Sequence, residues 1–176
     1  MMIELIFPTK EYRDQIAEYA KKFADENTNI PGVGIHGAGD LAKLDVDTWL
    51  QQCVDYKKGR SLPDGFVPAT QFLAVRKNDN KLVGMIAIRH SLTPHLLEIG
   101  GHVGYSVAPD ERGKGYATQM LRLGLVECKK LGIERVRVTC KTTNQASESV
   151  IKKCGGEFDG TAEYEGLTFN RYWITI

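Results

Sequence analysis

The sequence predicts a single α/β domain in which a mixed sheet is covered by helices. Its 176 residues are close to the commonest size of one domain. A hydrophobic fraction of 42% with 26% charged residues is typical of a globular protein with a sizeable core. The order of the patterns is the third observation: after an N-terminal helical extension, three extended runs are followed by helix, strand, helix and strand.

The first seventy residues contain two expected helices and two irregular segments. Apolar residues recur at helical spacing through residues 10–25. A second helix is expected from Asp40 or Asp47 to Tyr56. Glycines and prolines predict loops over residues 30–39 and 59–69, and loops this long are often functional.

Extended patterns follow in the middle of the chain. Residues 71–76 and 81–89 are expected to form a hairpin, joined by Asn78-Asp79-Asn80. A third strand is expected over residues 102–107. A helix then begins near Gly115 and runs to Leu131, with Gly132 as the residue that ends it.

The last third alternates strand and helix. In residues 135–140, Val136, Val138 and Cys140 are expected to point inward, and Arg135, Arg137 and Thr139 outward. Asn144 is a plausible N-cap for a helix over residues 145–154, which Gly155-Gly156 ends. Residues 168–176 are expected to form the final strand.

Charge and cysteine content exclude several function classes. Lys and Arg number 23 against 22 Asp and Glu, so no net charge attracts nucleic acid or an anionic membrane. The four cysteines form no C-x-x-C pair, and no metal site is expected. The absence of a signal-like N-terminal run and of a long apolar window predicts a cytoplasmic protein with reduced thiols. A homodimer stays open.

The most informative segment is residues 107–117, V-A-P-D-E-R-G-K-G-Y-A, where a strand ends and a helix begins. Gly113 and Gly115 allow a ligand to approach the backbone closely. Unpaired N–H groups at a helix N-terminus favour an anion such as a pyrophosphate, and Arg112 and Lys114 add positive charge. The alternative is a solvated basic turn without a ligand.

A family resemblance makes this segment specific. Arg112-Gly113-Lys114-Gly115-Tyr116-Ala117 fits the R/Q-x-x-G-x-G/A signature of the GCN5-related N-acetyltransferase (GNAT) superfamily. Residues 135–140 and Asn144-Gln145-Ala146-Ser147 resemble the next strand and helix start of that family. Two further segments, Ile88-Arg89-His90 and Gly100-Gly101-His102-Val103-Gly104-Tyr105, resemble the sequences of a group of uncharacterised bacterial acetyltransferases.

The resemblance implies an acetyl-CoA-dependent acyltransferase with a mixed, mostly antiparallel central sheet flanked by helices. One N-acetyltransferase domain would span residues 1–176, with an acetyl-CoA-binding core at 71–176 and variable acceptor-side helices and loops at 1–70. The enzyme would transfer the acetyl group to a primary amine of a small molecule, peptide or protein by direct attack in a ternary complex.

The resemblance also assigns the cofactor-binding residues. Backbone N–H groups from Arg112 to Ala117 would hold the CoA pyrophosphate, and a splayed strand pair would admit the pantetheine arm. Backbone groups of Tyr105 and Val107 would pair with that arm. The Val107 N–H would also polarise the thioester carbonyl and stabilise the oxyanion. Asn144 would contact the arm from the other side, unless it serves only as an N-cap.

An amine with pKa near 10.4 is only roughly one part in a few thousand free base at pH 7, so a general base is expected. His102 and Glu98 are the titratable candidates beside the third strand. His102 lies among glycines and could relay a proton, or it could be a hydrogen-bonded structural histidine. Glu98 could accept the ammonium charge of the substrate, or be an exposed loop carboxylate.

Two departures from the family pattern concern the mechanism. Ile151 stands where many members place a general-acid tyrosine, and Gly156 replaces a common aromatic residue. Tyr105, Tyr164 or Tyr172, water, or the low basicity of the thiolate could substitute for the missing acid. The sequence does not choose among them.

The acceptor site is expected in the least matched part of the chain. Its candidate walls are residues 31–39, which include His36, residues 63–68, and Arg89, His90 and His95.

Two alternative functions are a regulatory module and a nucleotide-binding domain. A module that binds acetyl-CoA for regulation without turnover would explain the missing tyrosine. A nucleotide-binding domain lacks both the Walker A spacing and the G-x-G-x-x-G fingerprint.

Overall fold

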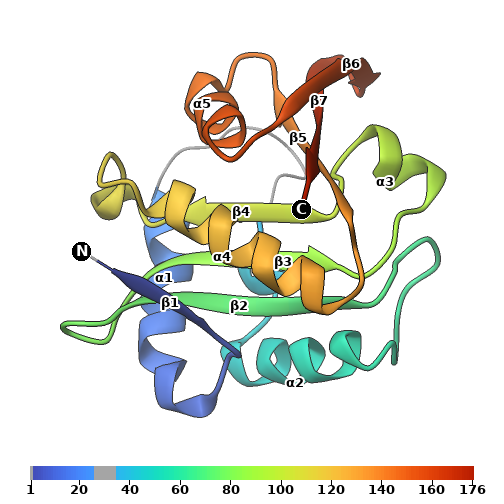
Figure 1. Cartoon of the computed structure of the whole chain (residues 1–176). Coiled ribbons are helices and arrows are strands. Elements are labelled where there is room, and N and C mark those ends of the chain that lie inside the picture. Colours follow the sequence, from blue (N-terminus) through green and yellow to red (C-terminus); the bar gives the residue numbers. More distant parts are fainter. Residues whose placement is uncertain (1, 26–34) are drawn as a thin grey trace.

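The computed structural model of the protein describes residues 2–25 and 35–176, and two sheets form its centre (Figure 1). The first has the order β1-β2-β3-β4 and is antiparallel throughout. Its strands are β1 (Ile3–Ile6), β2 (Ala69–Arg76), β3 (Lys81–Arg89) and β4 (Val103–Val107). The second, also antiparallel, has the order β5-β7-β6, from β5 (Arg135–Lys141), β6 (Glu157–Tyr164) and β7 (Leu167–Thr175). The predicted fold class is confirmed.

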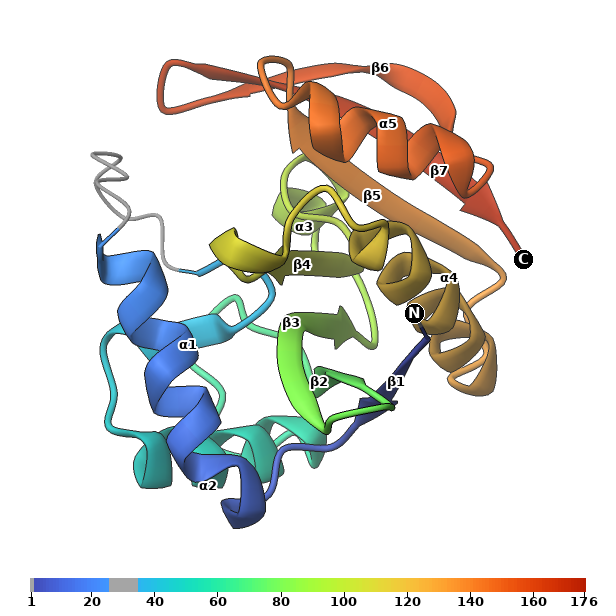
Figure 2. The ribbon, with the colours of Figure 1, turned by 90° about the vertical axis from the view of Figure 1, so that its left-hand side faces the viewer.

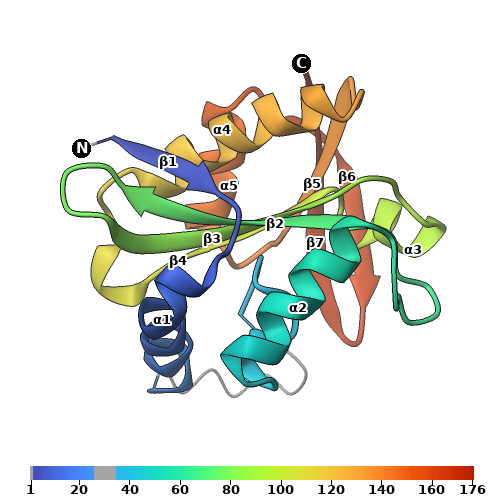
Figure 3. The same ribbon diagram turned by 90° about the horizontal axis from the view of Figure 1, so that it is seen from below.

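Helices cover both faces of the first sheet, as Figures 1 and 3 show. Helices α1 (Arg13–Asp25) and α2 (Val46–Lys57) pack on one face around a cluster that contains Ile16, Trp49, Leu73 and Met85. Helix α4 (Tyr116–Lys130) packs on the other face through Met120 and Leu121. Short 3₁₀ turns precede these helices at Lys10–Tyr12, Gly39–Ala42 and Pro109–Glu111.

Helix α5 (Gln145–Lys153) and the second sheet lie above β4 (Figure 2). A shared core joins them to the first sheet, because Ile88 and Val103 pack with Val138, Ile151 and residues of α4. This core places the C-terminal ends of β4 and β5 next to the N-termini of α4 and α5.

The segment that leads into β4 meets the middle of β5. An isolated bridge joins Gly101 to Val138, and the His102 N–H donates to the Arg137 carbonyl at 2.8 Å. The Gly100 N–H donates to Thr139 Oγ1 at 3.0 Å. Beyond this point the described residues contain no ladder between the two strands, so they splay apart as the resemblance implied.

Most predicted elements are confirmed, with boundaries within a few residues. Three elements were not predicted: β1, the short helix α3 (Pro94–Glu98) and β6. Arg137 lies on the face of β5 opposite Val136 and Val138, as expected, together with Arg135. It is nevertheless only 2% exposed, which the sequence did not predict. The buried guanidinium is paired with Asp159 at 2.6 Å and lies over the Trp173 ring. Residues 30–34 of the glycine-rich loop lie outside the described residues.

Within the described ranges, no helix combines the length and the apolar character that crossing a bilayer requires.

Candidate functional site

A cleft of about 1550 Å³ opens where β4 and β5 splay apart. This volume exceeds the roughly 300–1,000 Å³ of a typical small-molecule pocket, so it can hold two ligands. One part, which we call the α4 end, is lined by residues 17, 20–21, 23–24, 105–107, 111–113, 115–118, 140, 144, 146–147, 149–150 and 153. The other, which we call the hairpin end, is lined by residues 35–37, 89, 99–100, 103–104, 139, 141, 164–165, 167 and 169. Residues 41–42 and 44–46, before and at the start of α2, complete the lining of the cleft.

The turn before α4 has the geometry expected of an anion site. Gly113 and Gly115 both have positive φ, at +77° and +81°, and Gly115 is the N-cap of α4. A Cβ atom at either position would meet nothing within 4 Å, so the space in front of the turn is open. The first N–H groups of a helix have no partner inside it, and the helix dipole favours negative charge there. The turn therefore fits a pyrophosphate.

The buried carboxylate of Glu111 holds this turn in place through ion pairs. Its carboxylate is 2% exposed and pairs with Arg76 at 3.0 Å, Lys81 at 2.6 Å and Lys114 at 2.8 Å. Burial alone would raise the pKa of Glu111, but hydrogen bonds from Lys114 and Lys81 outweigh it and the pKa is lowered. The Lys114 ammonium is thus turned inward, whereas Arg112 lines the cleft and its Nε donates to the Val107 carbonyl at 3.3 Å. Of the two predicted basic side chains, Arg112 lines the cleft and Lys114 does not.

The edge of β4 presents backbone groups to the cleft. In the antiparallel ladder with β3, Ala108 N donates to Val83 and Arg89 N donates to His102. Because such bonds alternate along a strand, Gly104 and Ser106 pair with β3 while Tyr105 and Val107 point their N–H and C=O groups toward β5. The backbone groups of Tyr105 and Val107, which the family resemblance singled out, therefore face the gap between β4 and β5.

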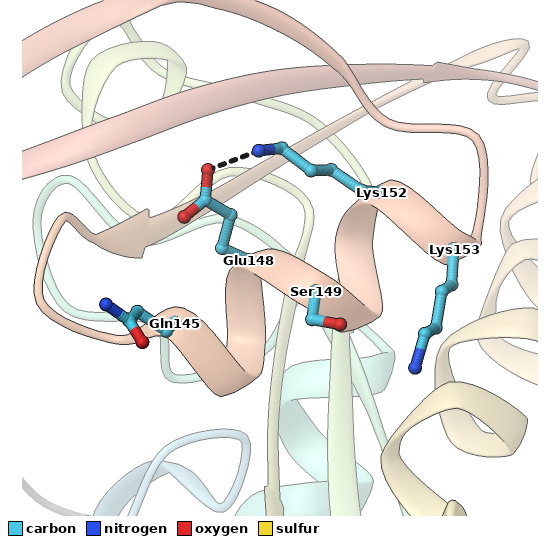
Figure 4. A pocket seen from close by; sticks show the side chains of 5 residues that line it. All are labelled: Gln145, Glu148, Ser149, Lys152 and Lys153. Carbon is cyan, nitrogen blue, oxygen red and sulfur yellow. Dashed lines mark ion pairs between the residues drawn. The ribbon is translucent and has the colours of Figure 1, made fainter.

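Helix α5 forms the opposite wall. The Asn144 side chain caps it by accepting from the Ser147 N–H at 3.1 Å, and Asn144 also lines the cleft, so both of its predicted roles remain compatible. A hollow of about 440 Å³ continues along the outer face of α5 (Figure 4). In it Lys152 pairs with Glu148 at 2.7 Å, whereas Lys153 points toward α4. Lys153 lines both the hollow and the cleft.

The hairpin end gathers basic groups. Arg89 at the end of β3, Lys141 at the end of β5 and His36 in the segment before α2 all line it, together with the carboxylate of Glu165. Asp45, at the start of α2, also lines the cleft, and its carboxylate accepts hydrogen bonds from Thr48. His36 is exposed. Partial desolvation, followed by the charges of Lys141 and Arg89, lowers its pKa.

The two predicted general bases do not line the cleft. His102 is 7% exposed, and its Nδ1 accepts the Arg137 backbone N–H at 2.9 Å. Burial and the charge of Arg89 lower the pKa of His102 to about 4. Glu98 ends α3, is exposed, and pairs with Arg171 of β7. This geometry favours structural roles for both, and their catalytic roles stay predictions.

The candidate proton donors are also separated by the structure. Ile151 is fully buried, so its position offers no hydroxyl. The Tyr105 hydroxyl reaches across the cleft to Ser147 Oγ at 2.8 Å, and burial raises the pKa of Tyr105 to about 12. Tyr164 lines the hairpin end, whereas the Tyr172 hydroxyl donates to Glu148 outside the cleft.

Comparisons with known proteins agree with this geometry. The family model of the acetyltransferase (GNAT) domain matches residues 9–157. No curated protein matches the sequence significantly.

Solved structures with the same fold include a ribosomal L7/L12 α-N-protein acetyltransferase bound to coenzyme A, with TM-score 0.71, 18% identity and coverage of 100% of this chain and 95% of that one. A Salmonella typhimurium acetyltransferase that modifies the N-terminal serine of L7/L12 has TM-score 0.68 and 19% identity, covering 100% and 96%. A microcin C7 self-immunity acetyltransferase in complex with acetyl-CoA and AMP has TM-score 0.65 and 18% identity, covering 99% and 92%. At these identities the likeness shows the fold alone.

Proposed function

The chain belongs to the GNAT family of acetyltransferases, and from this premise we propose that it transfers the acetyl group of acetyl-CoA to a primary amine in a ternary complex. One observation carries the proposal: the glycine turn of α4 and the outward-facing edge of β4 line the same cleft. A cofactor with a pyrophosphate at one end and an amide-bearing arm at the other matches both features. The cleft also has room for an acceptor beside it.

The residues present fit acetyl-CoA. In the proposal, the N–H groups from Arg112 to Ala117 bind the pyrophosphate, and backbone groups of Tyr105 and Val107 pair with the pantetheine amides. Asn144 contacts the arm from the α5 side. Lys153 and the Arg112 guanidinium supply positive charge for the phosphates of the nucleotide end.

Acetyl-CoA supplies an activated acyl group when bound, and the residues of this chain stabilise charge and move protons. The Val107 N–H donates to the acyl oxygen and so stabilises negative charge there. Tyr105 keeps its proton at neutral pH, because its pKa is raised to about 12, and it can donate to the departing sulfur.

The amine must lose a proton. His36 is the only imidazole that lines the cleft in the described part of the chain, and its lowered pKa keeps it neutral near pH 7. We therefore assign the proton acceptor to His36 in place of His102 and Glu98. A peptide α-amino group, with a pKa near 7.7–8.0, needs such help less than an aliphatic amine does.

The acceptor class is either a small-molecule amine or a peptide or protein amine. Neighbours that act on ribosomal proteins support the second, and the neighbour crystallised with AMP supports a small molecule equally. No observation favours the alternative of a regulatory module without turnover.

The decisive experiment compares two glycine variants. Gly115→Asp puts a carboxylate where the pyrophosphate is proposed to bind, and we expect acetyl-CoA affinity to fall roughly 100-fold in calorimetry. Gly132→Asp is the matched control at the other end of α4, since its φ of +76° and open surroundings impose similar backbone strain. It should leave the affinity unchanged.

Equal acetyl-CoA affinity in both variants would remove the turn from the cofactor site. Thiol release measured with DTNB over a panel of amines separates the enzyme from the regulatory module. Tight acetyl-CoA binding without any acceptor-dependent thiol release would favour the module.

A further inference from the structure

Arg89 is a largely enclosed cation whose charge no carboxylate in the described chain balances. Its Nη1 donates to the carbonyl oxygens of Gly101 at 3.0 Å and Gly100 at 3.4 Å. Guanidinium carries five N–H donors, and those on Nε and Nη2 have no partner among the described residues. Burial lowers the pKa of Arg89, although the group stays protonated because its ordinary pKa is above 12.

Lys141 adds a second cation at the same end of the cleft. It ends β5 opposite Phe169, is half-buried, and forms no ion pair with the described residues. Both Lys141 and Arg89 are close enough to His36 for their charges to lower its pKa. Two uncompensated cations thus flank one imidazole at the hairpin end.

The lack of an acidic partner distinguishes Arg89 from the other largely covered arginines of the described chain. Arg76, Arg137 and Arg171, the other largely covered arginines, each pair with a carboxylate. A buried charge without a partner costs several kcal/mol by general estimates, so such a group is typical of a site where a ligand supplies the counter-charge.

The phosphates of the cofactor do not explain these cations. The anion site proposed for CoA lies at the α4 end, on the turn with Gly113 and Gly115, whereas Arg89 contacts the segment that leads into β4. The two sets of residues line opposite ends of one cleft. The cations at the hairpin end therefore face the part left for the acceptor.

We propose that the hairpin end selects acceptor amines that carry an anionic group, a carboxylate or a phosphate, which Arg89 and Lys141 bind while Glu165 attracts the ammonium. The proposal rests on the acetyltransferase function proposed above. The planar fork of Arg89 suits a two-oxygen anion, and Lys141 acts as a point charge beside it. Binding the anion holds the amine next to His36.

The test uses matched acceptor pairs that differ only in the anion. The pairs are an amino acid and its α-carboxamide, an N-terminal Ser-Asp and Ser-Asn peptide amide, and phosphoethanolamine and ethanolamine. With acetyl-CoA and DTNB detection, the anionic member of at least one pair should have a kcat/KM roughly 10- to 100-fold higher. The pair that shows it identifies the source of the anion.

Two variants tie that preference to the residues. Lys141→Gln should reduce the ratio within the preferred pair about tenfold. Arg89→Lys keeps a charge and a donor for the Gly101 carbonyl but loses the fork, so it should reduce the ratio while the protein still folds. Arg60→Gln, an exposed arginine that does not line the cleft, is the control and should leave the ratio unchanged.

The outcomes that overturn the anion site differ from those that overturn the proposed acetyltransferase activity. Equal rates within all pairs, or a ratio that neither variant changes, would overturn the anion site while leaving an active acetyltransferase. If no amine reacts, calorimetry measures how tightly CoA-loaded protein binds the N-acetylated form of each member of a pair. Anion-selective binding that Lys141→Gln weakens would support the site, and equal or absent binding would overturn it.

Discussion

At the scale of single residues, His102 stabilises the point where β4 and β5 part. Its Nδ1 can accept the Arg137 N–H only in the neutral form with the proton on Nε2. Burial and the charge of Arg89 also disfavour protonation in the folded state, and they lower the pKa of His102 from 6.5 to about 4. Between these values the unfolded chain binds more protons, so the contribution of His102 to stability is lost as pH falls from about 6.5 to 4.

This leads to a paired prediction for the two imidazoles. His102→Gln keeps an acceptor for the Arg137 N–H, so the unfolding free energy at pH 7 should change by no more than about 1 kcal/mol. The decline of that free energy between pH 6.5 and 4 should become shallower.

His36→Gln should instead lower kcat by about 100-fold with an aliphatic amine and leave acetyl-CoA affinity intact.

Chemical denaturation at several pH values and pH–rate profiles check both expectations. Loss of the ascending limb of the pH–rate profile in His102→Gln, with none in His36→Gln, would return the general-base role to His102.

The site was predictable from sequence where backbone geometry supplies the chemistry. The glycines at 113 and 115 and the strand before them determine the turn locally, so the sequence located the turn before α4. The walls that α1 and α5 add to the α4 end were not predicted. Side-chain roles depend on partners far along the chain. His102 accepts from the Arg137 N–H, and Lys114 shares the Glu111 carboxylate with Arg76 and Lys81. No local sequence pattern reveals contacts between residues so far apart in the chain.

At the scale of elements, the segment before α2 is pressed onto β4. The Gly37 carbonyl accepts from Gln71 Nε2 at 2.6 Å, and a Cβ atom at Gly37 would lie 2.6 Å from Tyr105 Cα and as close to the Gly104 backbone. Only glycine permits this contact, because φ at Gly37 is +71° and the opposing atoms are backbone. Gly37, Gly104 and Tyr105 all line the cleft, so the contact holds two of its walls against each other.

Gly37→Ala should therefore destabilise the protein by about 3 kcal/mol and raise the KM of the acceptor. Gly39→Ala is the matched control, since φ there is +53° but its Cβ would meet nothing within 4 Å. Backbone strain alone should cost it about 1 kcal/mol. Thermal or urea unfolding of the two variants measures the difference, and equal losses would show that the contact with β4 does not limit the segment.

The elements that sequence patterns missed are short or irregular. Strand β1 has four residues and α3 has five, which is less than the window in which periodicity can be recognised. Strand β6 contains Gly160 at positive φ and a register shift beside Phe158, which breaks the alternation. The burial of Arg137 was not predicted, because a strand with a buried charge follows the same alternation as one with an exposed charge.

At the scale of the whole molecule, two sheets share one core but few backbone bonds. Strand β4 is the edge of the first sheet, β5 is the edge of the second, and their bridge lies at Gly101 and Val138. Edge strands with free N–H and C=O groups accept an extended partner. In the proposed complex the pantetheine arm is that partner, so the cofactor would connect the two sheets.

Hydrogen exchange can test this connection amide by amide. In the free protein, the Tyr105 and Val107 amides should exchange faster than those of Gly104 and Ser106, because only the latter pair with β3. At CoA concentrations of about 100 times Kd, exchange at Tyr105 and Val107 should slow by up to about 100-fold, with Gly104 and Ser106 changing far less. Gly115→Asp should remove the effect at the same concentration, and Gly132→Asp should retain it. If CoA instead slowed all four amides equally, it would stabilise the fold without pairing with the edge of β4, and the sheets would not be connected through the cofactor.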